Sequence, residues 1–259
     1  LLHFINNCPH CGVQDIESIL ATNPDYEFHY QTLKNYAYYH LNKGNPDFAF
    51  KLFQQCKDRF PDKSGGYSGL GAIIGYNDVK QAEKYFRKAK NKEPELSSNY
   101  SNLANCLRSY LSSEYEPELS EQESTNLTKK IKSLYKEAIS RDSTNFIALA
   151  GLASFQAEDK DFLLAIENGE RAIEIAEEKV INGQENAVAN LNKVRLLIST
   201  VLYNYSHSIS KDDQELSTKY FNKACDLDSL AVSSDPDEYN YLTLTNRGWY
   251  FYRAGHIDD

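Results

Sequence analysis

The 259-residue sequence predicts an all-α fold, an α-solenoid of stacked helix–turn–helix pairs. A small residue, an aromatic residue four positions later and a second small residue three positions after that recur along the chain. This spacing places all three residues on one stripe of a helix. A second amphipathic segment precedes each such helix, with turn residues between the two. One helix pair cannot bury its apolar stripe alone, so several pairs must stack to form a continuous core.

The small–aromatic–small pattern predicts the second helix of each pair. It is clearest at Ala49, Phe53 and Cys56, and Phe86 follows Phe53 by 33 positions. The small members let a neighbouring helix approach closely, and the aromatic residue fills the space between layers. Further instances are Ala82, Phe86 and Ala89; Ile131, Tyr135 and Ala138; Ala165, Gly169 and Ala172; and Ser217, Phe221 and Ala224.

The first helix of each pair has an apolar stripe of its own. Glycine in the turns, at Gly44 and Gly255, suits the left-handed backbone that follows a helix C-terminus. An unusually long first helix is expected over 185–208, and an acidic, serine-rich insertion over 112–126. The stripes lie at 33–37, 67–74, 100–107, 149–153 and 244–251.

These residues resemble the tetratricopeptide repeat (TPR), whose pattern is W-x2-L-G-x2-Y, a turn glycine, A-x3-F-x2-A and a closing proline. The match is clearest over 30–63 and 64–96, and over 246–255, which reads NRGWYFYRAG. Individual repeats are degenerate. The resemblance implies a right-handed superhelix with the first helices along its concave face.

The resemblance also implies a division of the chain. An N-terminal segment, 1–29, holds a partial repeat, and TPR-like repeats fill 30–239. Residues 240–259 form the first helix of a truncated repeat, whose apolar face would be exposed. We therefore expect the protein to continue past Asp259, and self-association through this open repeat is an alternative way to cover it. The individual repeats are expected at 30–63, 64–96, 97–145, 146–180 and 184–232.

Composition limits the partners. The 28 Lys and Arg residues against 37 Asp and Glu residues give a net charge of −9, and nucleic-acid binding needs a basic surface, so no nucleic acid is expected. A mean hydropathy of −0.60, with no run of about 18 apolar residues, predicts no membrane insertion. Cys56, Cys106 and Cys225 are interpreted as buried thiols in a reducing compartment, so a cytoplasmic protein is expected.

The one local motif with chemical content is CPHCG at 8–12. As a zinc knuckle, Cys8 and Cys11 would supply half of a tetrahedral site, with the other half upstream or from His3 and a neighbour. As a redox site, the pair would need a strand–helix context that the sequence lacks. In the third interpretation the two thiols bind nothing. No cofactor is expected, with zinc at Cys8 and Cys11 as the alternative.

No catalytic motif is present. The sequence has no hydrolytic triad, no phosphate-binding G-x-x-x-x-G-K-[ST] loop and no dinucleotide or H-E-x-x-H motif. The glycine-rich run 65–71 is interpreted as a helix start with small packing positions, and His40 as a packed or surface residue. We therefore expect the chain not to be an enzyme.

TPR proteins, as the resemblance implies, bind extended peptides or partner helices along the first-helix face. Lys34 fits the family's clamp for a chaperone carboxylate, but Tyr38 and Asn102 stand at other clamp positions, so that ligand is not expected. Tyr, Asn and Arg favour aromatic anchors and amide bonds to a peptide backbone. The candidate partner-binding residues are Lys34, Tyr38, Ser101, Asn102, Asn105, Arg108, Thr245, Trp249 and Tyr252.

The sequence thus predicts a non-catalytic scaffold or adaptor that binds a peptide or helix of a partner protein. Two alternatives stay open. The chain is the substrate-recognition arm of a larger enzyme, or it is a regulatory module that contains a zinc knuckle. Fold alone does not separate these functions.

Overall fold

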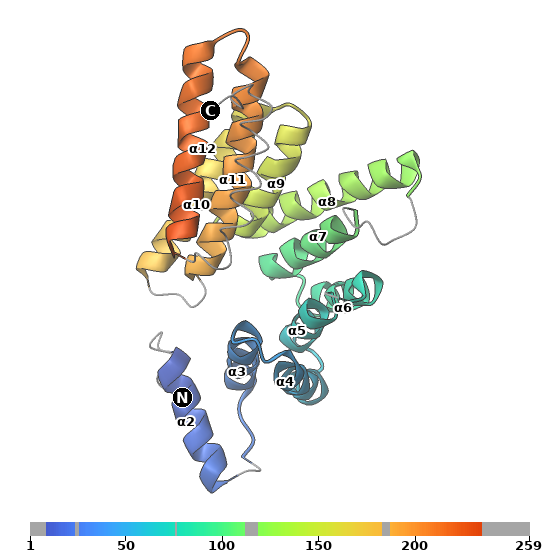
Figure 1. Ribbon diagram of the computed structural model, residues 1–259. Helices are drawn as coiled ribbons and strands as arrows, with labels where there is room; N and C mark the ends of the chain where they lie inside the picture. The colour runs from blue at the N-terminus through green and yellow to red at the C-terminus, as the bar shows by residue number, and fades with distance from the viewer. Residues whose placement is uncertain (1–8, 24–25, 76, 112–118, 183–186, 235–259) are drawn as a thin grey trace. The chain divides into compact units, whose positions relative to one another are not determined.

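The computed structural model describes residues 9–23, 26–75, 77–111, 119–182 and 187–234, and all regular structure in them is helical (Figure 1). The predicted all-α class is confirmed. The chain divides into two compact units, residues 1–142 and 143–259, which we call unit one and unit two. Each unit is a stack of helix pairs, as expected of a solenoid.

In unit one, each helix from α3 to α8 contacts the next along the chain, and the first helices α3 and α5 also contact each other. The N-terminal helix α2 contributes Val13 and Ile16 to the same apolar cluster as α3 and α4. The helices are α2 (Pro9–Thr22), α3 (Tyr30–Asn42), α4 (Pro46–Arg59), α5 (Gly65–Ile74), α6 (Val79–Lys92), α7 (Ser97–Leu111) and α8 (Glu121–Arg141).

Unit two repeats this arrangement with α9 (Phe146–Glu158), α10 (Phe162–Ile181), α11 (Ala187–Ile209) and α12 (Gln214–Ser234). Each helix contacts the next, and α9 also contacts α11. Nine of the 13 residues of α9 are buried. This burial explains why α9 is apolar around its whole circumference instead of along one stripe. The helix α11 is the long first helix expected over 185–208.

The helix pairs α3–α4, α5–α6, α7–α8, α9–α10 and α11–α12 fall, within two residues, in the five ranges predicted as repeats. The division into repeats itself stays a prediction. The truncated repeat at 240–259 and the turn at Gly255 lie outside the described residues, as do positions 1–8.

The small–aromatic–small pattern forms the core, as predicted. Ala49, Phe53 and Cys56 are fully buried, and so are Tyr135 and Ala138. Two glycines allow large side chains of neighbouring helices to pack directly against the helix backbone. The ring of Phe53 occupies the place where a Cβ on Gly69 would lie, and Ile198 does the same at Gly169.

The turns of two helix pairs use a left-handed residue. Gly44, predicted for this role, has φ +75° between α3 and α4. Lys160 has φ +66° between α9 and α10. A side chain at positive φ costs about 1–2 kcal/mol, so this turn is maintained by the packing of the two helices that it joins.

One boundary differs from the sequence expectation. The insertion expected over 112–126 is shorter, because α8 begins at Glu121. A capping box begins the helix: the Ser120 hydroxyl accepts the N–H of Glu123, and the Glu123 carboxylate accepts the N–H of Ser120 at 3.0 Å. This Ser-x-x-Glu signal is readable in the sequence, but the acidic composition of the stretch favoured a loop.

Candidate functional site

A cleft of about 360 Å³ lies in unit one, between the first helices α3, α5 and α7, with α6 beneath it. Three of the predicted partner-binding residues, Tyr38, Asn102 and Asn105, line it together. The described residues that line it are Tyr38, Ser68, Gly71, Ala72, Gly75, Val79, Phe86, Asn102, Asn105, Cys106 and Ser109.

The cleft exists because α5 presents almost no side chain to it. Gly71, Ala72 and Gly75 offer at most a methyl group. The ring of Phe86 lies directly under Gly71, where an added Cβ would come within 3.1 Å of it. The floor is therefore apolar and close to the backbone of α5. The prediction that the glycine-rich run begins a helix is confirmed, since α5 starts at Gly65.

The walls carry polar groups that the described chain does not use. The Tyr38 ring packs edge-on against Phe53 at a centroid distance of 4.8 Å, and burial raises the pKa of its hydroxyl. No hydrogen bond is recorded for the side chains of Tyr38 or Asn102 within the described residues. Both are therefore available to a ligand.

The side chain of Asn105 is held by a hydrogen bond from Tyr135 of α8. Its Oδ1 accepts a hydrogen bond of 2.6 Å from the hydroxyl of Tyr135. Burial raises the pKa of Tyr135, although the nearby Arg108 guanidinium, which is hydrogen-bonded to it, opposes this. With Oδ1 engaged, the Asn105 amide offers its N–H groups to the cleft. The hydrogen bond from Tyr135 thus determines that a ligand meets the N–H groups of Asn105 and not its oxygen.

The other predicted site residues lie elsewhere. Ser101 is 1% exposed and donates to the carbonyl of Ser98 at 3.2 Å, so it packs inside the unit instead of lining the cleft. Lys34 is half-buried, with its Nζ 5.8 Å from the centroid of the Tyr30 ring, and burial lowers the pKa of its amine. Arg108 does not line the cleft either. Thr245, Trp249 and Tyr252 lie outside the described residues.

Sequence reasoning missed the apolar half of the site. The sequence indicates Phe86 as a core residue only, because the floor that it forms depends on two helices packing together. Gly71 and Gly75, four residues apart in the sequence, do indicate a helix face without side chains. Cys106, also at the cleft, places its Sγ 3.6 Å from the carbonyl of Val79, and burial raises its thiol pKa to about 12. Burial of this kind lowers the reactivity of a thiol.

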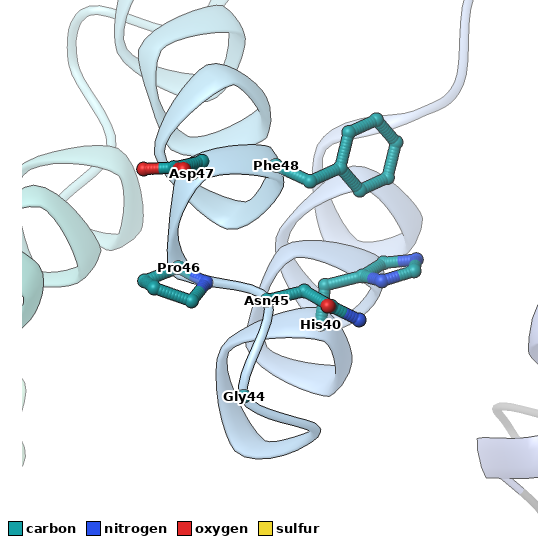
Figure 2. A pocket seen from close by; sticks show the side chains of 6 residues that line it. All are labelled: His40, Gly44, Asn45, Pro46, Asp47 and Phe48. Atoms are coloured by element: carbon teal, nitrogen blue, oxygen red, sulfur yellow. The ribbon is translucent and has the colours of Figure 1, made fainter.

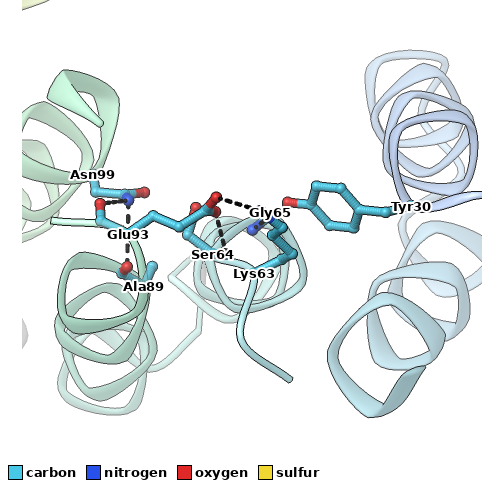
Figure 3. A network of polar contacts seen from close by, with 7 residues as sticks. All are labelled: Tyr30, Lys63, Ser64, Gly65, Ala89, Glu93 and Asn99. Atoms are coloured by element: carbon cyan, nitrogen blue, oxygen red, sulfur yellow. Dashed lines mark hydrogen bonds and ion pairs between the residues drawn. The ribbon is translucent and has the colours of Figure 1, made fainter. Parts of the chain in front are cut away.

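A polar network ties together the four helices that supply the cleft (Figure 3). At the start of α5, the N–H of Ser64 donates to the Glu93 carboxylate at 2.6 Å, and the N–H of Gly65 donates to the Tyr30 hydroxyl at 3.0 Å. Asn99, at the start of α7, donates to the carbonyls of Ala89 and Glu93 at 3.3 and 2.9 Å. The carboxylate thus satisfies a free N–H at the positive end of a helix.

The charge of Glu93 is stabilised by this network. Burial on its own would raise the pKa of Glu93, but the N–H and hydroxyl of Ser64 and the Lys63 ammonium, 3.3 Å away, hold it below its usual value. A carboxyl whose folded pKa is depressed contributes stability above its unfolded pKa. That contribution is lost as pH falls through the folded pKa.

Replacing Glu93 with Gln is expected to lower the free energy of unfolding by about 1.5–3 kcal/mol at neutral pH, because hydrogen bonds to a charged group are lost. The deficit should shrink as pH falls from the unfolded value of about 4.3 through the lower folded pKa of Glu93, where the wild-type carboxyl also becomes neutral. Urea denaturation at two pH values measures both effects. Glu95→Gln, at an exposed position nearby, is the control and should change little. An equal deficit for Glu93→Gln at both pH values would contradict the assignment.

A second cavity, of about 330 Å³, lies at the turn between α3 and α4 (Figure 2). The His40 ring packs edge-to-face against Phe48 and Tyr36, each at 4.6 Å between centroids. Both ring nitrogens of His40 are buried, and neither has a hydrogen-bond partner among the described residues. Burial lowers the pKa of His40, although Glu17 opposes this, and the Asp47 side chain points away from the ring. Its ring contacts make His40 a packing residue of this cavity.

The described residues contain no group of three or more His, Cys, Asp or Glu side chains that could hold a metal ion. Cys8 lies outside the described residues, and the side chain of Cys11, in α2, is not described. Zinc at Cys8 and Cys11 therefore stays a prediction. Within the described part of the chain, no helix is long and apolar enough to cross a membrane.

Solved structures share this fold at low sequence identity. TTC0263, a thermophilic TPR protein of Thermus thermophilus, has a TM-score of 0.60 and 13% identity over 87% of this chain and 99% of its own. A human IFIT1 dimer with m7Gppp-AAAA has a TM-score of 0.63 and 14% identity over 95% of this chain and 51% of its own. The APC/C hetero-tetramer Cut9–Hcn1 has a TM-score of 0.59 and 11% identity over 98% and 45%.

The chain therefore spans about half the length of the IFIT1 and Cut9–Hcn1 chains that it matches. No protein-family model matches the sequence, and no curated protein matches it. The likeness is one of fold, and at that level the resemblance to TPR proteins is confirmed.

Proposed function

We propose that this chain, which has the fold of TPR proteins, is a non-catalytic scaffold that binds a peptide segment or helix of a partner protein in the cleft between α3, α5 and α7. The observation that carries the proposal is the cleft itself: an apolar floor at Phe86 and unused polar groups at Tyr38 and Asn102. Peptide-binding sites combine these two features, since pockets take side chains and polar groups take the backbone.

The chemistry of the walls defines the ligand. Among the described residues, no charged side chain lines the cleft, so a neutral, apolar side chain enters it and packs on Phe86 and Val79. The amides of Asn102 and Asn105 pair with the N–H and C=O groups of the ligand backbone, which would otherwise lose their water partners without replacement. Tyr38 adds a ring and a hydroxyl, the combination that is enriched at binding surfaces.

The other predicted binding residues have a place in this proposal. Lys34 and Arg108 stand outside the cleft and would contact only the ends of a longer ligand. Thr245, Trp249 and Tyr252 are proposed to extend the binding face in the last repeat, where self-association is a competing use of the same surface. A cytoplasmic location, and the exclusion of nucleic acid by the net charge of −9, belong to the same proposal.

The experiment selects peptides from a random library on the whole chain and measures their affinity for variants. Asn102→Ala should weaken binding about tenfold, since one or two hydrogen bonds are lost. Ala72→Phe, which fills the cleft from α5, should abolish it. Asn91→Ala, at an exposed position of α6, is the matched control and should bind like wild type.

Because one protein of this fold was solved with m7Gppp-AAAA, the same capped oligonucleotide is tested in parallel. Peptide binding that is indifferent to Ala72→Phe would refute the cleft as the site. If no peptide is selected, and the oligonucleotide binds wild type but not Ala72→Phe, the ligand of the cleft is RNA and not a peptide. Circular dichroism of each variant verifies that the helices are retained.

A further inference from the structure

A second surface of unit one concentrates positive charge on an acidic chain. The helix α6 reads VKQAEKYFRKAKNK and contains six Lys and Arg residues against one Glu, whereas the whole chain has a net charge of −9. Lys84 and Lys88 are exposed, on the side of α6 opposite the buried Ala82 and Phe86. Residues four apart on a helix are neighbours on one face, so the lysines form a continuous row.

This row borders a depression of its own. Lys80, Lys84 and Lys88 line a hollow of about 370 Å³ together with Tyr85, Gln81 and Asp78, the residue that caps α6. None of these residues lines the cleft between α3, α5 and α7. We call Lys80, Lys84 and Lys88 with this hollow the lysine face.

Two described acidic residues near the lysine face, Glu83 and Asp78, have partners of their own. Glu83 forms ion pairs with Arg87 and, at 3.5 Å, with Lys130 of α8. The Asp78 carboxylate accepts the N–H of Gln81 at 2.8 Å as the cap of α6. No ion pair is recorded for Lys84 or Lys88 within the described residues. Their charges are therefore not neutralised by any described carboxylate, which is the condition for attracting an external one.

We propose that the lysine face docks an extended acidic peptide segment of a partner protein. Four residues of helix rise about 6 Å, and two residues of an extended strand span about 6.6 Å. Successive lysines of the row therefore match carboxylates at alternate positions of an extended segment. A peptide with Asp or Glu at every second residue places each carboxylate beside one ammonium group.

The observations favour a short peptide over a long polyanion. A nucleic acid or an anionic membrane would extend beyond the row and meet the negative remainder of the chain, while the field of the lysines is screened within about 8 Å. The guanidinium of Arg87, the group best suited to a phosphate, is occupied by Glu83. Tyr85 packs against the core cluster, so its ring is not free to stack on a base.

The test measures the fluorescence anisotropy of a labelled peptide of alternating Glu and Ser as the whole protein is added. Lys84→Glu/Lys88→Glu should weaken binding at least tenfold, and Lys84→Arg/Lys88→Arg should retain it. The control Lys211→Glu/Lys219→Glu makes the same charge change at exposed positions of unit two and should bind like wild type. Ala72→Phe should also bind the acidic peptide like wild type. The test of the lysine face is therefore independent of whether the cleft binds a peptide.

Three outcomes would overturn the proposal. The first is an equal loss in the unit-two control, because net charge alone would then explain the binding. The second is equal affinity for a peptide with its Glu residues in one block, because the spacing would then be irrelevant. The third is tighter, lysine-dependent binding of m7Gppp-AAAA or of vesicles containing phosphatidylserine, which would assign the face to another class of partner.

Discussion

Replacing Gly66 with Ala is expected to lower the free energy of unfolding of unit one by about 2–4 kcal/mol, because two helix backbones touch at this position. A Cβ on Gly66 would lie 2.5 Å from the backbone N of Lys57 and 3.0 Å from the carbonyl oxygen of Phe53. These are main-chain atoms of α4, which cannot rotate away as a side chain can. The variant can fold only if α4 and α5 move apart, which would open the core around Phe53.

The neighbouring glycine supplies the control. A Cβ on Gly65 would meet the Tyr30 hydroxyl and, at 2.8 Å, a carbon of the Lys34 side chain, and both are parts of side chains that can move. Gly65→Ala should therefore cost about 1 kcal/mol, because moving Tyr30 loses its hydrogen bond to the Gly65 N–H, while Ala favours the helix. Urea denaturation followed by circular dichroism compares the two variants. If Gly65→Ala proves as damaging as Gly66→Ala, close approach of the backbones is not the cause.

Replacing Tyr135 with Ala is expected to cost about 3–5 kcal/mol, the range for removing a large ring from a core. Tyr135 is fully buried in the small–aromatic–small stripe of α8, between Ile131 and Ala138. Tyr110→Ala, which removes a half-exposed ring of α7, should cost far less. Thermal denaturation of both variants measures the difference, and similar melting temperatures would contradict the burial argument.

The milder variant, Tyr135→Phe, separates the two roles of this residue. It keeps the ring and loses the 2.6 Å hydrogen bond to Asn105, so stability should fall by only about 1 kcal/mol. Asn105 is then free to turn its amide, and peptide affinity for the cleft should fall several-fold. Unchanged affinity would mean that the orientation of Asn105 does not matter to the ligand.

Much of the fold could be predicted from the sequence, because each second helix carries its own stripe. Phe53 and Phe86 are buried where the 33-residue spacing predicts. The start of α8 could not be predicted from composition, since the capping box at Ser120 lies in an acidic stretch that is also typical of a loop. The stripe expected at 149–153 holds only part of the apolar surface of α9, because most residues of this helix are buried, and periodicity cannot show a burial that extends beyond one face.

The candidate site was predicted only in part, and the reason is geometric. Consecutive residues of a helix point about 100° apart. An error of one position in the predicted face therefore assigns a core residue to the cleft. Ser101 and Asn102 show this: the first is buried and the second lines the cleft. The floor at Phe86 and the hollow above Gly71 arise only when α5 and α6 pack together. No single stretch of sequence contains that information.

The glycines of α5 have a consequence for the dynamics of unit one. Four of its ten residues are Gly, and each costs up to about 1 kcal/mol of helix stability relative to Ala. Isolated from its neighbours, α5 would not stay helical. It should therefore depend on its neighbours more than a glycine-free helix does, and its amide hydrogens should exchange with solvent when the packing of α4 and α6 against it opens. A ligand seated in the cleft would slow that exchange, and occupancy could be read from the protection of α5 alone.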